Sequence, residues 1–374
     1  MRVAAAIALA VAALVLGCAT PLGAAPPGAA LSRATPPGAT PRDAAPPQYP
    51  RGSAQLVVFT RYSPLFSNAQ IVRRLLSPLA AAAIHDSLAR SLEALTPYSL
   101  DLTKEKFLVY VPPGPPPSPR GFGLLVFVPP WDEARLPFGW ASQLSHYGVI
   151  FVTPAKAGNT TVVLSRRVPL AVAAEENIIR EYPIDRRHIY IGGFSGGSRV
   201  ALRIALGYPD VFRGALLNAG ADTLGGEHPL PPRDLLLRFQ SSSHLVYVTG
   251  ELDTFELAAD ASSLQSMRDW CVFSVETYET PAVGHELLSS SAFGRALDRL
   301  RQGVAPDAAR LAACRSRVQT DLAGGLAQAQ TLIDNGRPAA ARKLLLAIDD
   351  RYGGLAAPRI IELARRCKCA LPPP

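Results

Sequence analysis

Short apolar runs alternate with amphipathic stretches along the middle of the chain. The apolar runs lie at 54–60, 106–114, 123–130, 148–155, 188–195, 213–220, 245–251 and 271–279. The stretches with apolar residues three and four positions apart include 70–95, 168–182, 198–208 and 254–270. Runs of the first kind predict buried strands, and stretches of the second kind predict helices. Their alternation predicts an α/β fold with a mostly parallel, doubly wound sheet that helices cover on both faces.

The N-terminal end of the chain departs from this pattern. Arg2 precedes an apolar run, Val3–Leu16, which is too short to span a membrane and has the length of a signal-peptide core. The run leads into the letters VLGC, which resemble the lipobox of bacterial lipoproteins and make Cys18 a candidate lipidation site. Residues 19–52 are largely Ala, Pro, Gly and Thr and predict an extended tether. We expect a signal peptide over 1–18, with lipid anchoring at Cys18 or ordinary secretion as alternatives.

The C-terminal end is rich in Ala, Leu and Arg, and two or three helices fit its composition. The stretch GRPAAARKLLLAIDDRYGG resembles one helical hairpin of a tetratricopeptide-type array. A single such unit cannot bury its own apolar face, and the sequence has no second copy. We therefore expect the α/β domain to occupy 53–303. Residues 304–374 should form a helical appendage that packs on it as a cap or as a docking surface for a protein partner.

The net charge carries little information about partners. It is +8, and only five of the 38 basic residues are lysines. The arginines are scattered, with no run longer than two. A nucleic-acid binder would concentrate its basic residues on one element or interleave them with aromatic residues, so we expect no nucleic-acid partner.

Four cysteines remain when Cys18 is set aside. An even number in a chain predicted to leave the cytoplasm suggests disulfides. Cys314 lies in the same C-terminal segment as Cys367 and Cys369 and is expected to pair with one of them, while Cys271 stands apart. A metal at the CKC stretch is not expected, because that segment has no histidine and its spacing is not that of a zinc site.

Ser195 stands between a predicted strand and a predicted helix in the stretch IYIGGFSGGSRVALRIA. Gly193, Ser195 and Gly197 match G-x-S-x-G, in which the serine takes a strained backbone conformation and its small neighbours let the chain turn tightly. Parallel sheets place their reactive groups on loops at the carboxyl ends of the strands, where this serine falls. Ser195 is therefore a candidate nucleophile. A glycine-rich turn that meets no substrate is the alternative.

A serine nucleophile needs a histidine base at the same edge of the sheet. Four of the six histidines lie in helical stretches or where strands begin: His85, His146, His188 and His244. His228 follows the strand at 213–220, and His285 follows the last strand, in PAVGHELL. Both lie on the correct side, and we favour His285, with His228 in reserve.

The acid that orients the base should follow the strand at 245–251. Glu251 is still close to the strand end, whereas Asp253 lies on the loop that should face the serine. Asp253 could instead simply cap the following helix. The chain order Ser195, Asp253, His285 is the nucleophile, acid, base order of α/β-hydrolases, which favours Asp253 as the acid.

Residues 106–301 resemble an α/β-hydrolase, and in detail the polyhydroxybutyrate depolymerase and feruloyl esterase-like group. The stretch that begins YPIDRRHIYIGGFSGG resembles the pattern Y-x-x-D-x-x-R-[IV]-Y-x-x-G-x-S-G-G of that group. The matching positions are Tyr182, Asp185, Tyr190, Gly193, Ser195, Gly196 and Gly197. The resemblance implies an α/β-hydrolase fold and ester cleavage, and it does not extend to the tether, the stretch at 70–95 or the C-terminal helices.

The turn that should help to bind the oxyanion departs from that group. A histidine-glycine turn is usual there, but this chain reads VFVPPWDE. Pro129 and Pro130 have no amide hydrogen, so Trp131 is the first available donor, together with Gly196 beside the nucleophile.

These features together predict a secreted, lipid-anchored serine hydrolase of the bacterial cell envelope. It would cleave carboxylic esters, of a small molecule or a polymer, through an acyl-enzyme that needs no metal and no organic cofactor. A serine peptidase of the same fold uses the same machinery. A non-catalytic envelope binding protein on the same scaffold is the alternative from another class, motivated by the VPPW turn and the added helices.

Overall fold

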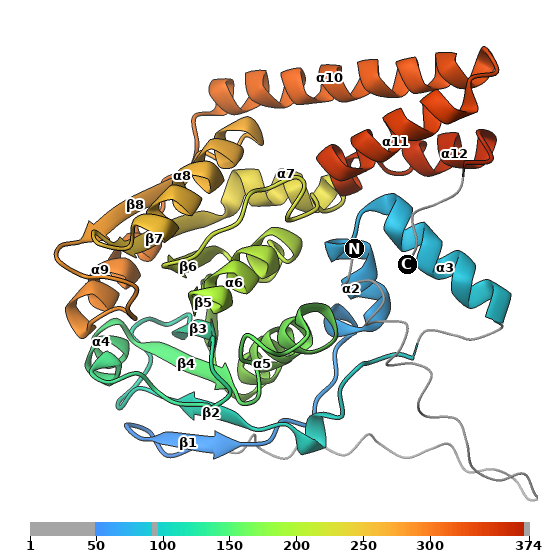
Figure 1. The fold of residues 1–374 in the computed structure, drawn as a ribbon. Helices are drawn as coiled ribbons and strands as arrows, with labels where there is room; N and C mark the ends of the chain where they lie inside the picture. Colours follow the sequence, from blue (N-terminus) through green and yellow to red (C-terminus); the bar gives the residue numbers. More distant parts are fainter. Residues whose placement is uncertain (1–48, 92–95, 370–374) are drawn as a thin grey trace, which may run out of the picture.

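A computed structural model describes residues 49–91 and 96–369 (Figure 1). The predicted signal peptide, Cys18 and the tether up to residue 48 lie outside this part. The centre is one eight-stranded sheet with the order β1-β2-β4-β3-β5-β6-β7-β8. Its strands are β1 (Ala54–Val57), β2 (Phe107–Tyr110), β3 (Phe122–Val128), β4 (Val149–Pro154), β5 (Ile184–Phe194), β6 (Gly214–Asn218), β7 (His244–Gly250) and β8 (Val275–Thr280). Strand β2 is antiparallel to β1 and β4, and the other pairs are parallel, which confirms the predicted fold class.

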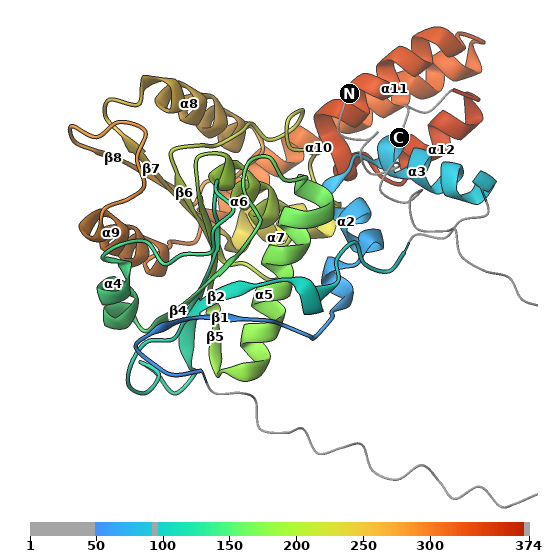
Figure 2. The ribbon, with the colours of Figure 1, turned by 60° about the horizontal axis from the view of Figure 1, so that its bottom comes forward.

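Helices cover both faces of this sheet (Figure 2). The helices before the C-terminal segment are α2 (Asn68–Leu75), α3 (Pro78–Ser91), α4 (Trp140–Tyr147), α5 (Val168–Glu181), α6 (Gly196–Gly207), α7 (Arg233–Ser242), α8 (Thr254–Asp269) and α9 (Ser290–Arg301). Side chains of β3 alternate between two cores, with Leu124 in one and Leu125 in the other. Helices α4 and α9 close the second core, where the rings of Trp140 and Phe293 stack at 3.7 Å. The alternation is the period-2 pattern of a strand buried on both sides.

The described part of the stretch at 70–95, which ends at residue 91, is two helices instead of one. Leu76 ends α2 with extended backbone, and Pro78 is the first residue of α3. Because proline has no amide hydrogen and restricts the residue before it, it starts a helix readily and does not continue one. Arg74 of α2 bonds Asp210, which ties this segment to the loop after α6.

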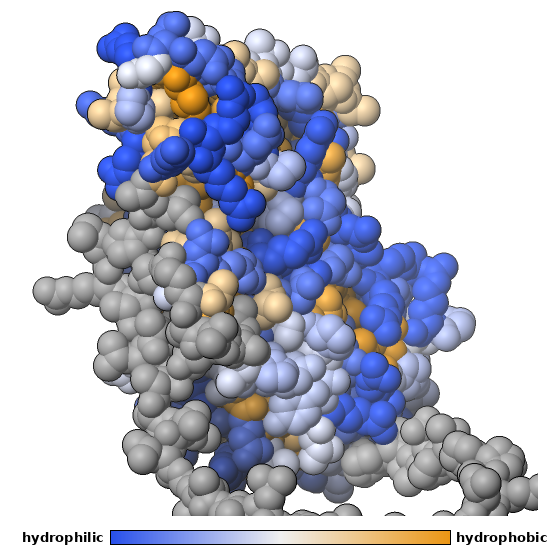
Figure 3. Space-filling model, turned by 90° about the vertical axis from the view of Figure 1, so that its right-hand side faces the viewer, coloured by the Kyte–Doolittle hydropathy of each residue, from blue (hydrophilic) through white to orange (hydrophobic). Residues whose placement is uncertain are grey.

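The C-terminal helices are α10 (Ala308–Asp334), α11 (Pro338–Tyr352) and α12 (Arg359–Arg366). The stretch that resembles a hairpin is the single helix α11, which pairs with α10. Asp349 of α11 accepts hydrogen bonds from Ser77 and from the amide of Leu79, and Arg315 of α10 donates to Gln240 of α7. These helices therefore pack on α3 and α7. The side of the molecule that carries α3 and α12 is mostly hydrophilic, with small separate hydrophobic patches (Figure 3). None of the helices in the described part is long and apolar enough to cross a membrane.

The predicted disulfide pairing is wrong. Cys314 pairs with Cys271, whose Cα lies 5.7 Å away, and Cys367 pairs with Cys369. Cys271 lies two residues after the end of α8, and α10 runs beside this position. The partner of Cys314 is therefore in the α/β domain and not in the C-terminal segment. The bond therefore fastens α10 to the sheet domain.

We expect Cys314→Ser to lower the free energy of unfolding. The bond closes a loop between residues 43 apart. Cross-links of this kind stabilise folded proteins by about 2 to 4 kcal/mol, largely by restricting the unfolded chain. Guanidinium unfolding of the oxidised protein measures this change. Cys369→Ser opens a bond between residues only two apart and is the matched control, with little expected effect. Equal stability of the Cys314→Ser variant and the wild-type protein would contradict the prediction.

Glu175 of α5 should make stability depend on pH. Burial, with Glu176 beside it, raises the pKa of Glu175 from 4.5 to about 8, and its Oε2 has no hydrogen-bond partner among the described residues. A carboxyl whose pKa is higher in the folded state stabilises the fold at low pH. Its contribution falls by up to about 1.4 kcal/mol per pH unit as pH rises between the two values.

Glu175→Gln should therefore be more stable than the wild-type protein at pH 8 and lose most of that advantage near pH 5. Thermal unfolding across this pH range is the measurement. Glu176→Gln is the control, because Glu176 is already paired with Arg180 at 2.6 Å. A pH-independent difference between Glu175→Gln and the wild-type protein would count against the buried neutral carboxyl.

Candidate active site

Ser195 occupies a tight turn between β5 and α6. Its backbone has φ 53° and ψ −128°, which is a strained conformation for a residue with a side chain. The turn needs glycine on both sides. A methyl group at Gly193 would collide with the carbonyl of Gly197, and one at Gly197 would collide with the carbonyl of Val128. The amide of Ser195 donates to the carbonyl of Asn218 at 2.9 Å, which holds the turn against β6.

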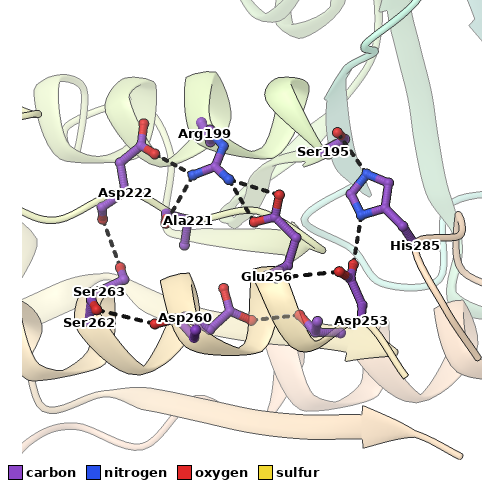
Figure 4. A network of polar contacts seen from close by, with 12 residues as sticks. Ser195, Arg199, Ala221, Asp222, Asp253, Glu256, Asp260, Ser262, Ser263 and His285 are labelled. Carbon is purple, nitrogen blue, oxygen red and sulfur yellow. Dashed lines mark hydrogen bonds and ion pairs between the residues drawn. The ribbon is translucent and has the colours of Figure 1, made fainter. Parts of the chain in front are cut away.

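His285 and Asp253 continue from the serine in one hydrogen-bonded chain (Figure 4). The Oγ of Ser195 lies 2.9 Å from Nε2 of His285, and Nδ1 of His285 lies 2.6 Å from Oδ2 of Asp253. With a proton on Nδ1, the ring donates to the carboxylate and leaves Nε2 free to accept from the serine hydroxyl. The structure thus brings together the three residues that the sequence singled out.

Asp253 makes both of the contacts considered for it. One oxygen, Oδ1, accepts from the amide of Glu256 at 3.3 Å and caps α8, while Oδ2 bonds His285. The side chain of Asp253 is 7% exposed and that of His285 is 42% exposed. The carboxylate is therefore held inside the protein, whereas the imidazole is partly open to solvent.

Asn218, at the end of β6, holds the histidine loop in place and was missed by the sequence analysis. Its Oδ1 accepts from the amide of Leu288 at 3.1 Å, and its Nδ2 donates to the carbonyls of Val248 and, at 3.4 Å, Glu286. The signal in the sequence was a polar residue that ends the apolar run GALLN. The ring of Phe194 also packs 5.0 Å from the ring of His285.

The other candidates for the base and the acid, His228 and Glu251, make different contacts. His228 is buried and its Nε2 is 3.4 Å from Oδ2 of Asp222, away from Ser195. Burial, with Arg203 nearby, holds the pKa of His228 well below its ordinary value. Glu251 accepts from the amide of Ala282 at 2.9 Å and braces the loop that carries His285.

The turn at 129–132 faces the start of α6. The amide of Trp131 donates no hydrogen bond to any described residue, and the first amides of α6 have no partner within their own helix. The indole ring lies 6.3 Å from the ring of Phe194, with the guanidinium of Arg135 4.3 Å above it. Pro130 accepts from the amide of Asn159 at 3.0 Å, which ties the turn to the loop after β4. The donors at Trp131 and Gly196 are thus available for an anionic oxygen.

No group of three or more His, Cys, Asp or Glu side chains in the described ranges is arranged to hold a metal ion.

The sheet order and the strained serine turn at its carboxyl edge define an α/β-hydrolase fold. No protein-family model matches the sequence. Over 119 residues the chain is 30% identical to the protein named "Putative esterase NocK" of Nocardia uniformis subsp. tsuyamanensis. That stretch is 32% of this chain and only 29% of the length of that relative.

Solved structures that the chain resembles include esterases and a depolymerase. LpqC, a poly(3-hydroxybutyrate) depolymerase from Bordetella parapertussis, is 18% identical with a TM-score of 0.40, over 56% of this chain and 90% of that one. Est1E from Butyrivibrio proteoclasticus is 12% identical with a TM-score of 0.39, over 53% and 93%. The S-formylglutathione hydrolase FrmB from Staphylococcus aureus is 14% identical with a TM-score of 0.41, over 52% and 92%. The fold assignment rests on the sheet topology and the serine turn.

Proposed function

We propose that this protein is a serine hydrolase that cleaves carboxylic esters through an acyl-enzyme. The observation that carries the proposal is the hydrogen-bonded chain from Ser195 through His285 to Asp253, with the serine on a strained turn at the carboxyl edge of the sheet. An aligned base and acid are what a serine hydroxyl needs in order to act as a nucleophile at neutral pH.

In this mechanism Ser195 attacks the ester carbonyl while Nε2 of His285 takes the hydroxyl proton. Asp253, buried and bonded to Nδ1, fixes the tautomer of the ring and stabilises the imidazolium. The tetrahedral intermediate then collapses as His285 gives its proton to the leaving alcohol oxygen. A water molecule, deprotonated by the same ring, then attacks the acyl carbonyl. The bond between that carbon and Ser195 Oγ breaks, Oγ takes the proton back from His285, and the carboxylic acid leaves. The ring is 42% exposed, which leaves room for both substrate and water beside it.

The amides of Gly196 and Trp131 are proposed to hold the oxyanion. Trp131→Pro removes the amide hydrogen and is expected to lower kcat by about 10²- to 10³-fold, the usual effect of losing one such donor. Trp131→Ala keeps the amide and removes only the ring, so its kcat should stay much closer to that of the wild-type protein. Steady-state hydrolysis of a p-nitrophenyl ester measures both variants. Equal losses in the two would assign the effect to the ring and contradict the amide role.

The substrate class is tested with a panel of esters of graded acyl length that includes feruloyl and hydroxybutyryl esters. We expect turnover of esters, with peptide amides cleaved far more slowly. Cleavage of peptides in preference to every ester would make the protein a peptidase of the same fold. A folded protein that turns over no member of the panel would favour the non-catalytic binding alternative.

We also propose that the protein is secreted to the cell envelope and anchored through a lipid on Cys18. The support is the N-terminal sequence, in which an apolar run of signal-peptide length leads into VLGC. Labelled palmitate should enter the wild-type protein and not Cys18→Ala. If the protein is secreted but takes up no palmitate, the N-terminal segment is a signal peptide and Cys18 carries no lipid anchor.

A further inference from the structure

Arg199 joins the nucleophile helix to the helix of the acid. It lies one turn after Ser195 on α6, and its amide donates to the carbonyl of Ser195 at 3.3 Å. Its side chain crosses to α8, where Nη2 donates to both carboxylate oxygens of Glu256 at 2.8 and 2.6 Å. Nη1 donates to Asp222 at 2.5 Å and to the carbonyl of Ala221 at 3.3 Å. Figure 4 shows this guanidinium between the two carboxylates.

Glu256 connects Arg199 to Asp253. It stands in the first turn of α8, its side chain is buried, and its amide donates to Oδ1 of Asp253. The same aspartate holds His285 through its other oxygen. The position of the first turn of α8 therefore helps to set the position of Oδ2 of Asp253. Arg199 holds that turn through its ion pair with Glu256.

Three buried carboxyl groups at the start of α8 make the positive charge of Arg199 important there. Asp253 caps α8, Glu256 and Asp260 lie in its first two turns, and all three are buried. Burial raises the pKa of Asp260 to about 6, with Glu256 adding to the rise and Arg199 opposing it. Removing one partner of a buried ion pair leaves an uncompensated charge, which is far more disruptive than removing both partners. Without Arg199, Glu256 would carry an unpaired charge one turn from Asp253.

We propose that Arg199 is a positioning residue: by pairing with Glu256 it holds the first turn of α8 so that Asp253 meets His285. This inference rests on the proposed ester hydrolysis. The arginine itself touches none of the three residues with its side chain, and it acts through Glu256. It should therefore affect the chemical step more than substrate binding.

The test compares Arg199→Met with the double variant Arg199→Met, Glu256→Gln. The single variant should lose about 10²-fold in kcat with KM nearly unchanged, the size expected for a misplacement of about 1 Å at the site. The double variant should recover most of that loss, because the unpaired charge on α8 at Glu256 is gone. Asp222 also loses its partner, but its side chain is 20% exposed and it lies on the loop after β6 instead of on α8. Arg203→Met is the matched control. Arg203 lies one turn further along α6 and donates to the carbonyl of Leu75 instead of reaching α8, so this variant should keep the wild-type kcat.

Circular dichroism and thermal unfolding establish that each variant is folded. If Arg199→Met does not fold, the double variant and Arg199→Lys, which keeps the charge, decide the matter. Both should fold with kcat within about tenfold of the wild-type value, since replacing a buried pair or keeping its charge avoids the unpaired carboxylate. A folded Arg199→Met with the wild-type kcat, or a loss as large in the double variant as in the single one, would overturn the inference. Absence of turnover in the wild-type protein would overturn the proposed function and this inference with it.

Discussion

Ser195→Ala is expected to remove essentially all ester hydrolysis, with a loss of about 10⁴-fold or more in kcat, because its hydroxyl is the group proposed to form the acyl-enzyme. The serine hydroxyl bonds His285 and its loss leaves the fold intact, so the melting temperature should hardly change. Hydrolysis of a p-nitrophenyl ester, with circular dichroism as the check on folding, measures both effects.

The matched control for this variant is Ser198→Ala. Ser198 lies three residues after Ser195, in the first turn of α6, and its buried hydroxyl has no hydrogen-bond partner among the described residues. We expect it to keep the wild-type rate. Residual activity of Ser195→Ala above a tenth of the wild-type rate would mean that hydrolysis proceeds without this serine.

The second large effect is expected at the histidines. His285→Ala removes the ring that hydrogen-bonds the Ser195 hydroxyl, and should cost about as much as the loss of the serine itself. His228→Ala removes a buried ring beside Asp222, and should lower stability while leaving kcat nearly unchanged. The two variants are compared in the same ester assay after correction for the folded fraction.

The comparison separates a catalytic base from a packing residue of the same type. A greater loss of kcat in folded His228→Ala than in His285→Ala would reverse the assignment. If His228→Ala loses activity only in proportion to its unfolded fraction, the result agrees with His285 as the base.

Local pattern was enough to predict most of the fold. Each strand of the sheet overlaps an apolar run predicted from the sequence, although β8, VETYET, is mostly polar and begins later than its run. Helices α5, α6 and α8 begin and end within a few residues of the predicted stretches. The three residues of the hydrogen-bonded chain could be chosen because a nucleophile, an acid and a base must all lie at the carboxyl edge of the sheet. That constraint left few histidines and carboxylates to choose from.

Long-range packing could not be predicted in this way. The pairing of Cys271 with Cys314 depends on where α10 lies against the body, which no local pattern encodes. The role of Asn218 depends on the approach of the histidine loop to β6, and the ion pair of Arg199 with Glu256 depends on how α6 packs beside α8. In the sequence these residues are single polar positions among many.

The central claim, that Ser195 is an activated nucleophile, is tested most directly by covalent labelling with a fluorophosphonate. We predict one adduct per chain, located by peptide mass spectrometry on the peptide that contains Ser195, absent from Ser195→Ala and strongly reduced in His285→Ala. Equal labelling of the wild-type protein and Ser195→Ala, or no adduct on the folded wild-type protein, would contradict the account.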